Sequence, residues 1–592
     1  MGNEKENINQ LISSAERIGT IGSPSSTGEL SLDILGTAVK KKLVGELAFF
    51  TFLQDGNPNY ALGQITEIQL RNIWLEGPTM RSLVRQRGLV NPVSEQQDTH
   101  LGQMIISAVF SNESDKFEPS LLGTVPATGT FIKLATDQIL DCLLERYRDE
   151  IFYLGKVYGS APKLPLWFKH FGTGPHGAGE AYHIGFFGKT GSGKSVLAMM
   201  AIIAYARYSN MGIFILDPQG QFALSLKNKE EISDMIHILN SDVLESFGRK
   251  HKIFDLKNLR LDRWEIFTEL LREYRFFFKL GIKSFEYQDI VADDIVEFLR
   301  KESSIRLDNL DRVALKKVLE YLHKAIEKIY GQKSGIERVK KFIEETLEDL
   351  QNDKLSSIIS NWEKVSKFFT AGDDKKTPEQ IVWQSLYPDD RPIIVIDLSQ
   401  KPDEVEQHIW DSKIKPLLID RFIQAITTMA EVAYQKKEQG NLNTLVLIDE
   451  AHRLAPREKQ ANERNEKIKN RLIDATRTTR KYGLGWIFIS TTLSSLHREI
   501  IGQLRILFFG FGLAFGPEFI SLREYVGDPK ALKLYQSFRD PHSAFDIESR
   551  QYAFMTIGPI SPLSFAGTPL FFTAFNTPRD FLKNNRLKRE GF

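Results

Sequence analysis

The sequence predicts an α/β protein built around a parallel β-sheet, and three observations lead to that prediction. Short, predominantly apolar runs without polar alternation recur from residue 182 onward, they alternate with segments of helical spacing, and a glycine-rich turn joins one run to a helix. Strands without polar alternation are typical of a parallel sheet that helices cover on both faces. The runs are 182–187, 212–217, 393–397, 445–449 and 486–490.

The glycine-rich turn reads G-K-T-G-S-G-K-S and is an intact Walker A phosphate-binding loop. An apolar strand precedes it and an apolar helix follows it, which is the context that this motif requires. Glycines allow consecutive backbone N–H groups to turn toward phosphate oxygens, and the helix N-terminus adds partial positive charge there. The residues predicted to bind the nucleotide are Gly188, Lys189, Thr190, Gly191, Ser192, Gly193, Lys194, Ser195 and Val196.

Two side chains of the loop have distinct expected roles. Lys194 is placed to reach the β- and γ-phosphates, and the Ser195 hydroxyl to ligate Mg²⁺. The sequence therefore predicts a nucleoside triphosphate bound together with Mg²⁺.

A second motif, T-L-V-L-I-D-E at Thr444 to Glu450, has the Walker B pattern of an aliphatic strand that ends in two acids. Asp449 at the end of the strand is expected to hold the Mg²⁺. Glu450 is expected to orient and deprotonate the attacking water. A nucleotide sensor has no need of the second acid, so the pair predicts hydrolysis.

The region before the core has a different character. Short alternating or β-branched runs, such as 43–50 and 104–110, are separated by turn signals at 55–58 and 126–129. This punctuation predicts a small antiparallel barrel, with a small sandwich as the alternative.

A long charged segment with apolar residues at three-to-four-residue spacing predicts a helical insertion that divides the core. The expected organisation is a flexible N-terminus, a β-barrel, the first part of the core, the helical insertion, and the second part of the core with the C-terminal tail. The corresponding ranges are 1–29, 30–136, 137–227, 228–390 and 391–592.

The composition limits the number of domains, the class of protein and the cellular compartment to be expected. A chain of 592 residues is too long to fold around one hydrophobic core, so several domains are expected. A hydrophobic content of 42% with 26% charged residues is typical of globular proteins. Cys142 is the only cysteine, which favours a reducing compartment. The polar N-terminus is unlike a signal peptide, and no apolar stretch has the length of a transmembrane helix. We therefore expect a cytoplasmic protein with no membrane association.

Three core segments resemble HerA, the hexameric ATPase and DNA translocase of the HerA/FtsK superfamily. They read G-I-F-I-L-D-P-Q-G-Q-F at 212–222, L-I-D-E-A-H-R-L-A-P at 447–456, and R-K-Y-G-L-G-W-I-F-I-S at 480–490. The resemblance implies ATP as the nucleotide and a RecA-like P-loop ATPase core. It also implies an N-terminal barrel like that of ATP synthase and an insertion within the core.

The segments depart from the HerA pattern at three positions. Gln219 and Gln221 replace a histidine and a glutamate, and Thr491 occupies the place of the glutamine that senses the γ-phosphate. A threonine hydroxyl still donates to phosphate or water, with a shorter reach than an amide. Thr491 is therefore included among the catalytic residues.

Ring ATPases complete each site with an arginine from the neighbouring subunit. Arg480 stands where the family has its R-K pair, and Arg477 is the alternative.

The resemblance implies a homo-hexamer that moves double-stranded DNA through its channel. Six copies would bring basic residues into a ring, which reconciles a net charge of +1 with a polyanionic partner. No nuclease motif is present, so an effector in trans is expected: a nuclease similar to NurA, or a sirtuin-type NAD hydrolase. The departures from the archaeal pattern favour a bacterial member of the antiphage-defence type.

Two other hypotheses belong to different classes. The ring could be an assembly scaffold that organises and activates an effector, with ATP as a conformational switch. A conjugation or secretion motor would be expected to carry a membrane anchor, which this sequence lacks.

Overall fold

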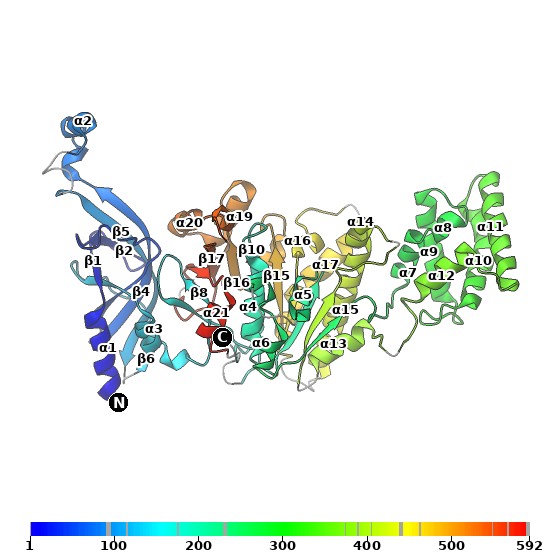
Figure 1. Ribbon diagram of the computed structural model, residues 1–592, viewed down its shortest axis with the longest axis horizontal. Coiled ribbons are helices and arrows are strands. Elements are labelled where there is room, and N and C mark those ends of the chain that lie inside the picture. Colours follow the sequence, from blue (N-terminus) through cyan, green and yellow to red (C-terminus); the bar gives the residue numbers. More distant parts are fainter. Residues whose placement is uncertain are drawn as a thin grey trace.

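The computed structural model describes residues 2–89, 96–113, 116–174, 177–228, 234–372, 374–387, 390–403, 405–436, 442–460, 463–546, 549–564 and 567–587. Three regions follow one another along the long axis: a β-barrel at one end, an α/β core in the middle, and a helical bundle at the other end (Figure 1). Within the described residues, no helix has the length and apolar character needed to span a membrane.

The N-terminal region is a closed antiparallel barrel, as predicted. Its strands follow the order β2-β1-β7-β3-β4-β5, and β5 pairs back with β2 to close six strands, while β6 extends β5 outside the ring. Apolar side chains such as Leu30, Phe50 and Met104 fill the interior. The strands are β1 (Arg17–Ile21), β2 (Glu29–Ile34), β3 (Leu47–Gln54), β4 (Asn57–Arg71), β5 (Thr99–Glu113), β6 (Lys116–Ser120) and β7 (Phe131–Leu134).

The N-terminus differs from the expectation of a flexible segment over 1–29. It contains helix α1 (Gly2–Ser14) and barrel strand β1. Ile8 of α1 is buried, and α1 packs on α3 (Asp137–Leu143). Ile18 and Ile21 of β1 are buried in the barrel. Packing of these few apolar side chains against α3 and inside the barrel therefore orders a segment whose polar composition predicts flexibility.

The barrel also extends an arm. Strands β4 and β5 continue beyond the ring and carry the short helix η1 (Ile73–Glu76) and helix α2 (Pro78–Arg87) at their tip (Figure 1).

The core contains the predicted parallel sheet. Seven parallel strands follow the order β12-β13-β11-β14-β15-β10-β16, and the antiparallel strands β17, β18, β8 and β9 extend the sheet beyond β16. This is a RecA-like P-loop core. The strands are β8 (Ile151–Val157), β9 (Lys163–Trp167), β10 (Ile184–Phe187), β11 (Gly212–Asp217), β12 (His251–Phe254), β13 (Ile393–Asp397), β14 (Thr444–Ile448), β15 (Leu484–Ser490), β16 (Ile506–Gly510), β17 (Tyr552–Ile557) and β18 (Leu570–Ala574).

Burial explains why these strands lack polar alternation. Every residue of β11, β14 and β15 is buried. Successive side chains enter two different clusters, as Phe186 packs with α4 on one face while Phe187 packs with α15 on the other. One face carries α4 (Lys194–Ala206), α5 (Gln221–Lys227), η3 (Met235–His237) and α6 (Ser241–Glu245), and the other carries α13 (Pro378–Leu386), α15 (Lys415–Lys436) and α17 (Glu463–Thr478).

The helical insertion is narrower than the predicted 228–390. Strand β12 joins the core sheet beside β13, and α13 packs on α15 of the core. The separate bundle centres on Trp362, whose ring lies 5.0 Å from that of Phe267 and whose Nε1–H donates to Leu310 O. Its helices are α7 (Trp264–Glu273), α8 (Phe276–Lys279), α9 (Phe285–Lys301), α10 (Arg312–Ile329), α11 (Lys333–Gln351) and α12 (Ser357–Ser366).

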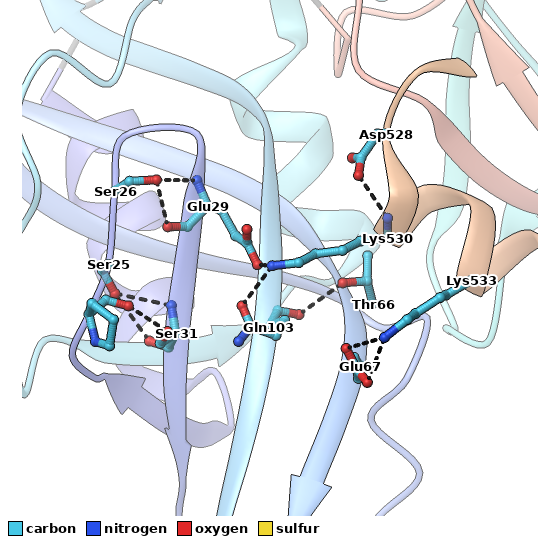
Figure 2. A network of polar contacts seen from close by, with 11 residues as sticks. Ser25, Ser26, Glu29, Ser31, Thr66, Glu67, Gln103, Asp528, Lys530 and Lys533 are labelled. Carbon is cyan, nitrogen blue, oxygen red and sulfur yellow. Dashed lines mark hydrogen bonds and ion pairs between the residues drawn. The ribbon is translucent and has the colours of Figure 1, made fainter. Parts of the chain in front are cut away.

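The C-terminal part of the core contacts the barrel. Helix α19 (Gly516–Val526) and helix α20 (Pro529–Gln536) follow β16, and the 3-10 turn η6 (Pro541–Ser543) leads toward β17. Lys530 and Lys533 of α20 form ion pairs with Glu29 and Glu67 of the barrel (Figure 2).

The remaining elements are short connections or caps. They are η2 (Glu145–Tyr147), α14 (Gln407–Ile409), η4 (Trp410–Ile414), α16 (Ala451–Leu454), η5 (Thr479–Tyr482), α18 (Arg498–Gln503) and α21 (Pro578–Asn584).

Candidate nucleotide site

The phosphate-binding loop joins β10 to α4 in the predicted way. Gly188, Gly191 and Gly193 have positive φ angles of 150°, 82° and 87°. A Cβ atom on Gly191 would lie 2.1 Å from His542 Nε2, and one on Gly193 would lie 2.8 Å from the Tyr552 ring. The loop therefore requires glycine at these positions both for its backbone conformation and for lack of space.

Lys194 begins helix α4 and is directed back along the loop. Its Nζ donates to Lys189 O at 3.0 Å, and the side chain is largely buried. Burial lowers the pKa of Lys194, while the nearby carboxylates of Glu450 and Asp449 oppose that shift. The lysine and both predicted acids are thus close enough to influence one another's charge.

Asp449 follows the last residue of β14 at the carboxyl edge of the sheet. It is 3% exposed, and its Oδ1 accepts the backbone N–H of Glu450 at 2.9 Å. Burial, reinforced by the charges of Glu450 and Asp217, raises the pKa of Asp449 to about 7. A cation nearby would stabilise the ionised form of this carboxyl group.

Glu450 has an unusual backbone. Its φ of 53° and ψ of 41° are left-handed, a conformation that non-glycine residues rarely adopt. Its Oε2 lies 3.5 Å from His452 Nε2 and 3.8 Å from Arg453 Nε. His452 Nδ1 lies 3.2 Å from the Ser490 hydroxyl at the end of β15. The Glu450 carboxylate therefore lies between the ends of β14 and β15 and the short helix α16.

One cavity of about 500 Å³ brings the predicted groups together, a size typical of small-molecule sites. Thr491 lines it beside the phosphate loop, Asp449 and Glu450, and so do Gln219 and Gln221. The predicted site residues that line the cavity are Thr190, Gly191, Gly193, Lys194, Ser195, Val196, Asp449, Glu450 and Thr491. The other loop residues, Gly188, Lys189 and Ser192, lie in the same loop without lining the cavity.

The residues of the cavity fit Mg²⁺ with a nucleotide. A hydroxyl from Ser195 and a carboxylate from Asp449 both reach it. Mg²⁺ in nucleotide sites is commonly held by one or two protein oxygens together with phosphate oxygens. No group of three or more His, Cys, Asp or Glu that could hold a metal occurs within the described parts of the chain, so this donor set depends on the nucleotide to complete it.

The two predicted arginines lie elsewhere. Arg480 is in η5, just before β15 begins, and Arg477 lies in the last turn of α17. Thr491 follows the other end of β15, a strand of seven residues, so Arg480 and Thr491 are separated by about 20 Å along the sheet. Arg480 Nε lies 3.8 Å from Glu180 Oε2, and Arg477 pairs with Glu499. Neither arginine is among the described residues that line the cavity.

The far wall of the cavity was not predicted. His542 comes from η6, Tyr552 from the start of β17, and Ala574, Phe575 and Asn576 from the end of β18 and the residues after it. These antiparallel strands carry no nucleotide motif. No local signal in the sequence indicates these residues, because they reach the phosphate loop only through the pairing of strands that are distant in the sequence.

The sequence pattern indicates Asp217 only as the end of a strand. It is fully buried and accepts backbone N–H groups from Gly220 at 2.8 Å and Ala223 at 2.9 Å. Burial raises its pKa to about 6 despite these hydrogen bonds. Asp217 therefore fixes the turn that carries Gln219 and Gln221 to the cavity.

Residues 181–414 match the family model described as the central domain of helicase HerA. This segment, which is less than half of the chain, is similar to that central domain. This HerA-type segment holds the phosphate loop, β11 and the helical bundle, and it ends before Asp449 and Glu450. No curated protein matches the chain.

Several solved structures are similar to the chain at low identity. VirB4 of Thermoanaerobacter pseudethanolicus is 14% identical, with a TM-score of 0.36, over 73% of this chain and 97% of that one. The bacterial conjugative coupling protein TrwB is 14% identical, with a TM-score of 0.27, over 55% and 68%. The genome packaging NTPase B204 from Sulfolobus turreted icosahedral virus 2, in complex with AMP, is 10% identical, with a TM-score of 0.28, over 67% and 98%.

Proposed function

We propose that this chain is an ATP hydrolase that forms a hexameric ring and couples hydrolysis to the movement or remodelling of double-stranded DNA. The observation that supports hydrolysis best is the single cavity shared by the phosphate loop, Asp449 and Glu450. A site that only sensed nucleotide would not need a second carboxylate beside the first. The HerA-type central domain supports the motor part of the proposal.

Each side chain has a role in this proposal. The loop N–H groups and Lys194 bind the β- and γ-phosphates, and Ser195 and Asp449 hold Mg²⁺, which neutralises phosphate charge when bound. Glu450 accepts a proton from the attacking water, a role that contributes about 10²- to 10⁴-fold to rate in enzymes. The Thr491 hydroxyl donates to the γ-phosphate or to that water.

A ring is proposed because the arginines lie at the opposite edge of the sheet. Arg480, with Arg477 as the alternative, would complete the site of the next copy rather than its own. The ring would also bring basic residues of six copies around one channel. That arrangement supplies the positive potential that DNA requires, although a single chain has a net charge of only +1.

The proposed effector is a separate protein, either a nuclease similar to NurA or a sirtuin-type NAD hydrolase. Antiphage defence is the setting that we propose for the pair. The departures of Gln219, Gln221 and Thr491 from the archaeal HerA pattern favour this bacterial type.

The test is the ATPase rate with and without linear double-stranded DNA. We expect DNA to stimulate the wild type, Lys194→Ala to abolish hydrolysis, and Glu450→Gln to bind ATP while hydrolysing it about 10²- to 10⁴-fold more slowly. Lys301→Ala is the matched control, since Lys301 is exposed on α9 and its one ion pair within the described part of the chain is with Glu297 one turn away.

The outcomes separate the parts of the proposal. Normal turnover in Lys194→Ala would refute the phosphate-loop assignment. A wild type that hydrolyses ATP without any response to DNA, yet still activates an effector, would favour the scaffold with ATP as a switch.

A further inference from the structure

The segment that connects β16 to β17 contacts both the phosphate loop and the barrel. Helix α20 lies against the barrel, and η6 follows it by a few residues and reaches the nucleotide cavity. The motifs in the sequence assign no function to this segment. Its contacts at the two ends connect the barrel with the nucleotide cavity.

His542 of η6 lies directly on the tip of the phosphate loop. Its Nε2 is 2.1 Å from the position that a Cβ of Gly191 would occupy, and the residue lines the cavity with Thr190 and Lys194. Within the described residues, the imidazole ring makes no hydrogen bond or ion pair. A donor nitrogen is therefore available at the place where the phosphates of a nucleotide would lie.

The backbone of His542 is fixed although its ring is available. The Asp540 side chain accepts the His542 N–H at 2.9 Å, and the Ser543 hydroxyl donates to Asp540 O at 2.7 Å. Pro541, between them, is buried. The turn thus presents the imidazole ring to the cavity without depending on any contact that the ring makes.

Helix α20 connects this turn to the base of the phosphate loop. The Tyr535 hydroxyl donates to Gly510 O at 2.6 Å and accepts the Leu513 N–H at 3.1 Å. The neighbouring Phe511 O accepts the Lys189 N–H of the loop at 2.9 Å. Tyr535 is fully buried. It therefore holds α20 against the segment after β16 that also contacts the phosphate loop.

The other side of α20 forms ion pairs and a hydrogen bond with the barrel (Figure 2). Lys530 pairs with Glu29 on β2 and donates to Gln103 Oε1 on β5 at 3.3 Å. Lys533 lies 3.3 Å from Glu67 on β4. The barrel thereby sets the position of α20, and the turn that carries His542 follows α20 by a few residues.

We propose that His542 is a nucleotide-contact residue that donates from its ring to a phosphate oxygen of ATP, and that the barrel positions it through Lys530 and Lys533. This inference rests on the proposed ATP site. Hydrogen bonds to a charged acceptor are stronger than neutral ones, so one such contact is worth about tenfold to a hundredfold in affinity.

The direct test is titration with a fluorescent ATP analogue, mant-ATP, in the presence of Mg²⁺. We expect His542→Ala to weaken binding by about tenfold or more, and His542→Gln, which keeps a donor, to restore part of the loss. His323→Ala is the matched control, because His323 is a histidine on α10 of the helical bundle that pairs with Glu344 and does not line the cavity. Unchanged binding by His542→Ala would overturn the proposal.

Lys194→Ala in the same titration distinguishes a failure of the nucleotide site from a failure of the histidine contact. If it binds mant-ATP normally, the proposed nucleotide site itself fails. If it loses binding while His542→Ala keeps full affinity, only the role of His542 fails.

The positioning by the barrel is tested by a double-mutant cycle. We expect Lys530→Ala combined with Lys533→Ala to weaken mant-ATP binding several-fold in the wild-type background, and to have no further effect when His542 is already alanine. An equal loss in both backgrounds, or no loss in either, would contradict the positioning of His542 through α20.

Discussion

The two edges of the central sheet carry different functional groups: the predicted nucleotide-binding residues lie at the carboxyl edge, and the two candidate arginines lie at the amino edge. At the carboxyl edge, the phosphate loop, Asp449, Glu450 and Thr491 converge on one cavity. At the amino edge, Arg477 and Arg480 lie beside acidic partners on the surface, and about half of each side chain is exposed. A single chain therefore brings the predicted nucleotide-binding groups together, and it holds its two candidate arginines away from its own cavity.

The proposal therefore assigns the motifs of one chain to two different sites. Because about 20 Å of strand separates Arg480 from Thr491, no change of rotamer brings the arginine to its own phosphate loop. In the proposal, Arg480 or Arg477 therefore acts on another copy. Glu180, which pairs with both Arg480 and Arg505, would have to release Arg480 for that role.

Among the variants that test the comparison of the two edges, Arg480→Ala is expected to have the largest effect on the rate of ATP hydrolysis. In related phosphoryl transfer, an arginine supplied by a partner contributes about 10³- to 10⁵-fold to the rate. We expect a loss of that order in the hydrolysis rate with little change in ATP affinity, because the residue is absent from the cavity of its own chain. Steady-state ATPase assays and mant-ATP titration measure the two quantities.

Arg477→Ala serves as the comparison for Arg480→Ala. A larger loss with Arg477→Ala would move the role to that residue. Full activity in both variants would remove the amino edge from catalysis.

A smaller effect concerns the stability of the amino edge. His183 is 1% exposed, its Nε2 lies 2.8 Å from Thr476 O, and its Nδ1 accepts the Trp486 N–H at 3.2 Å. These contacts require a neutral ring, and burial lowers the pKa of His183 to about 4. The histidine thus connects β10 with β15 and with the end of α17, next to Arg477.

The sign of the pH effect follows from the lowered pKa. The unfolded chain binds a proton on this histidine below about pH 6.5, whereas the folded chain resists it until about pH 4, so stability falls as pH decreases between those values. From pH 7 to pH 5 the expected loss from His183 is about 2 kcal/mol in the free energy of unfolding. Urea denaturation at both pH values measures it, and His183→Asn should show a smaller pH dependence. An equal dependence in both proteins would exclude His183 as the cause.

Much of the carboxyl edge could be predicted from the sequence, because short-range physics fixes it. The glycines at 188, 191 and 193 require one backbone conformation, and an aliphatic strand that ends in Asp449 and Glu450 places both acids at one edge of a parallel sheet. A small antiparallel barrel could be predicted as well, with a sandwich as the alternative, since its alternating runs and turns are local, whereas its closure by six strands is visible only in the structure.

What escaped prediction depends on contacts between distant segments. His542 and Tyr552 reach the phosphate loop only because β17 pairs antiparallel with β16. The order of α1 depends on packing against α3, and β12 is a four-residue strand whose place comes from its pairing with β13. None of these contacts has a local signal in the sequence. The distance between Arg480 and the cavity likewise became visible only with the order of the sheet.

The most direct test of the two-site account is complementation between defective copies. Lys194→Ala keeps its arginines but has a defective phosphate loop, and Arg480→Ala keeps the loop but lacks the arginine. Each variant alone should be nearly inactive, and mixed oligomers from coexpression should regain a measurable part of the wild-type ATPase rate, because some sites combine an intact loop with an intact Arg480. Mixed oligomers that remain as inactive as the single variants would contradict the account.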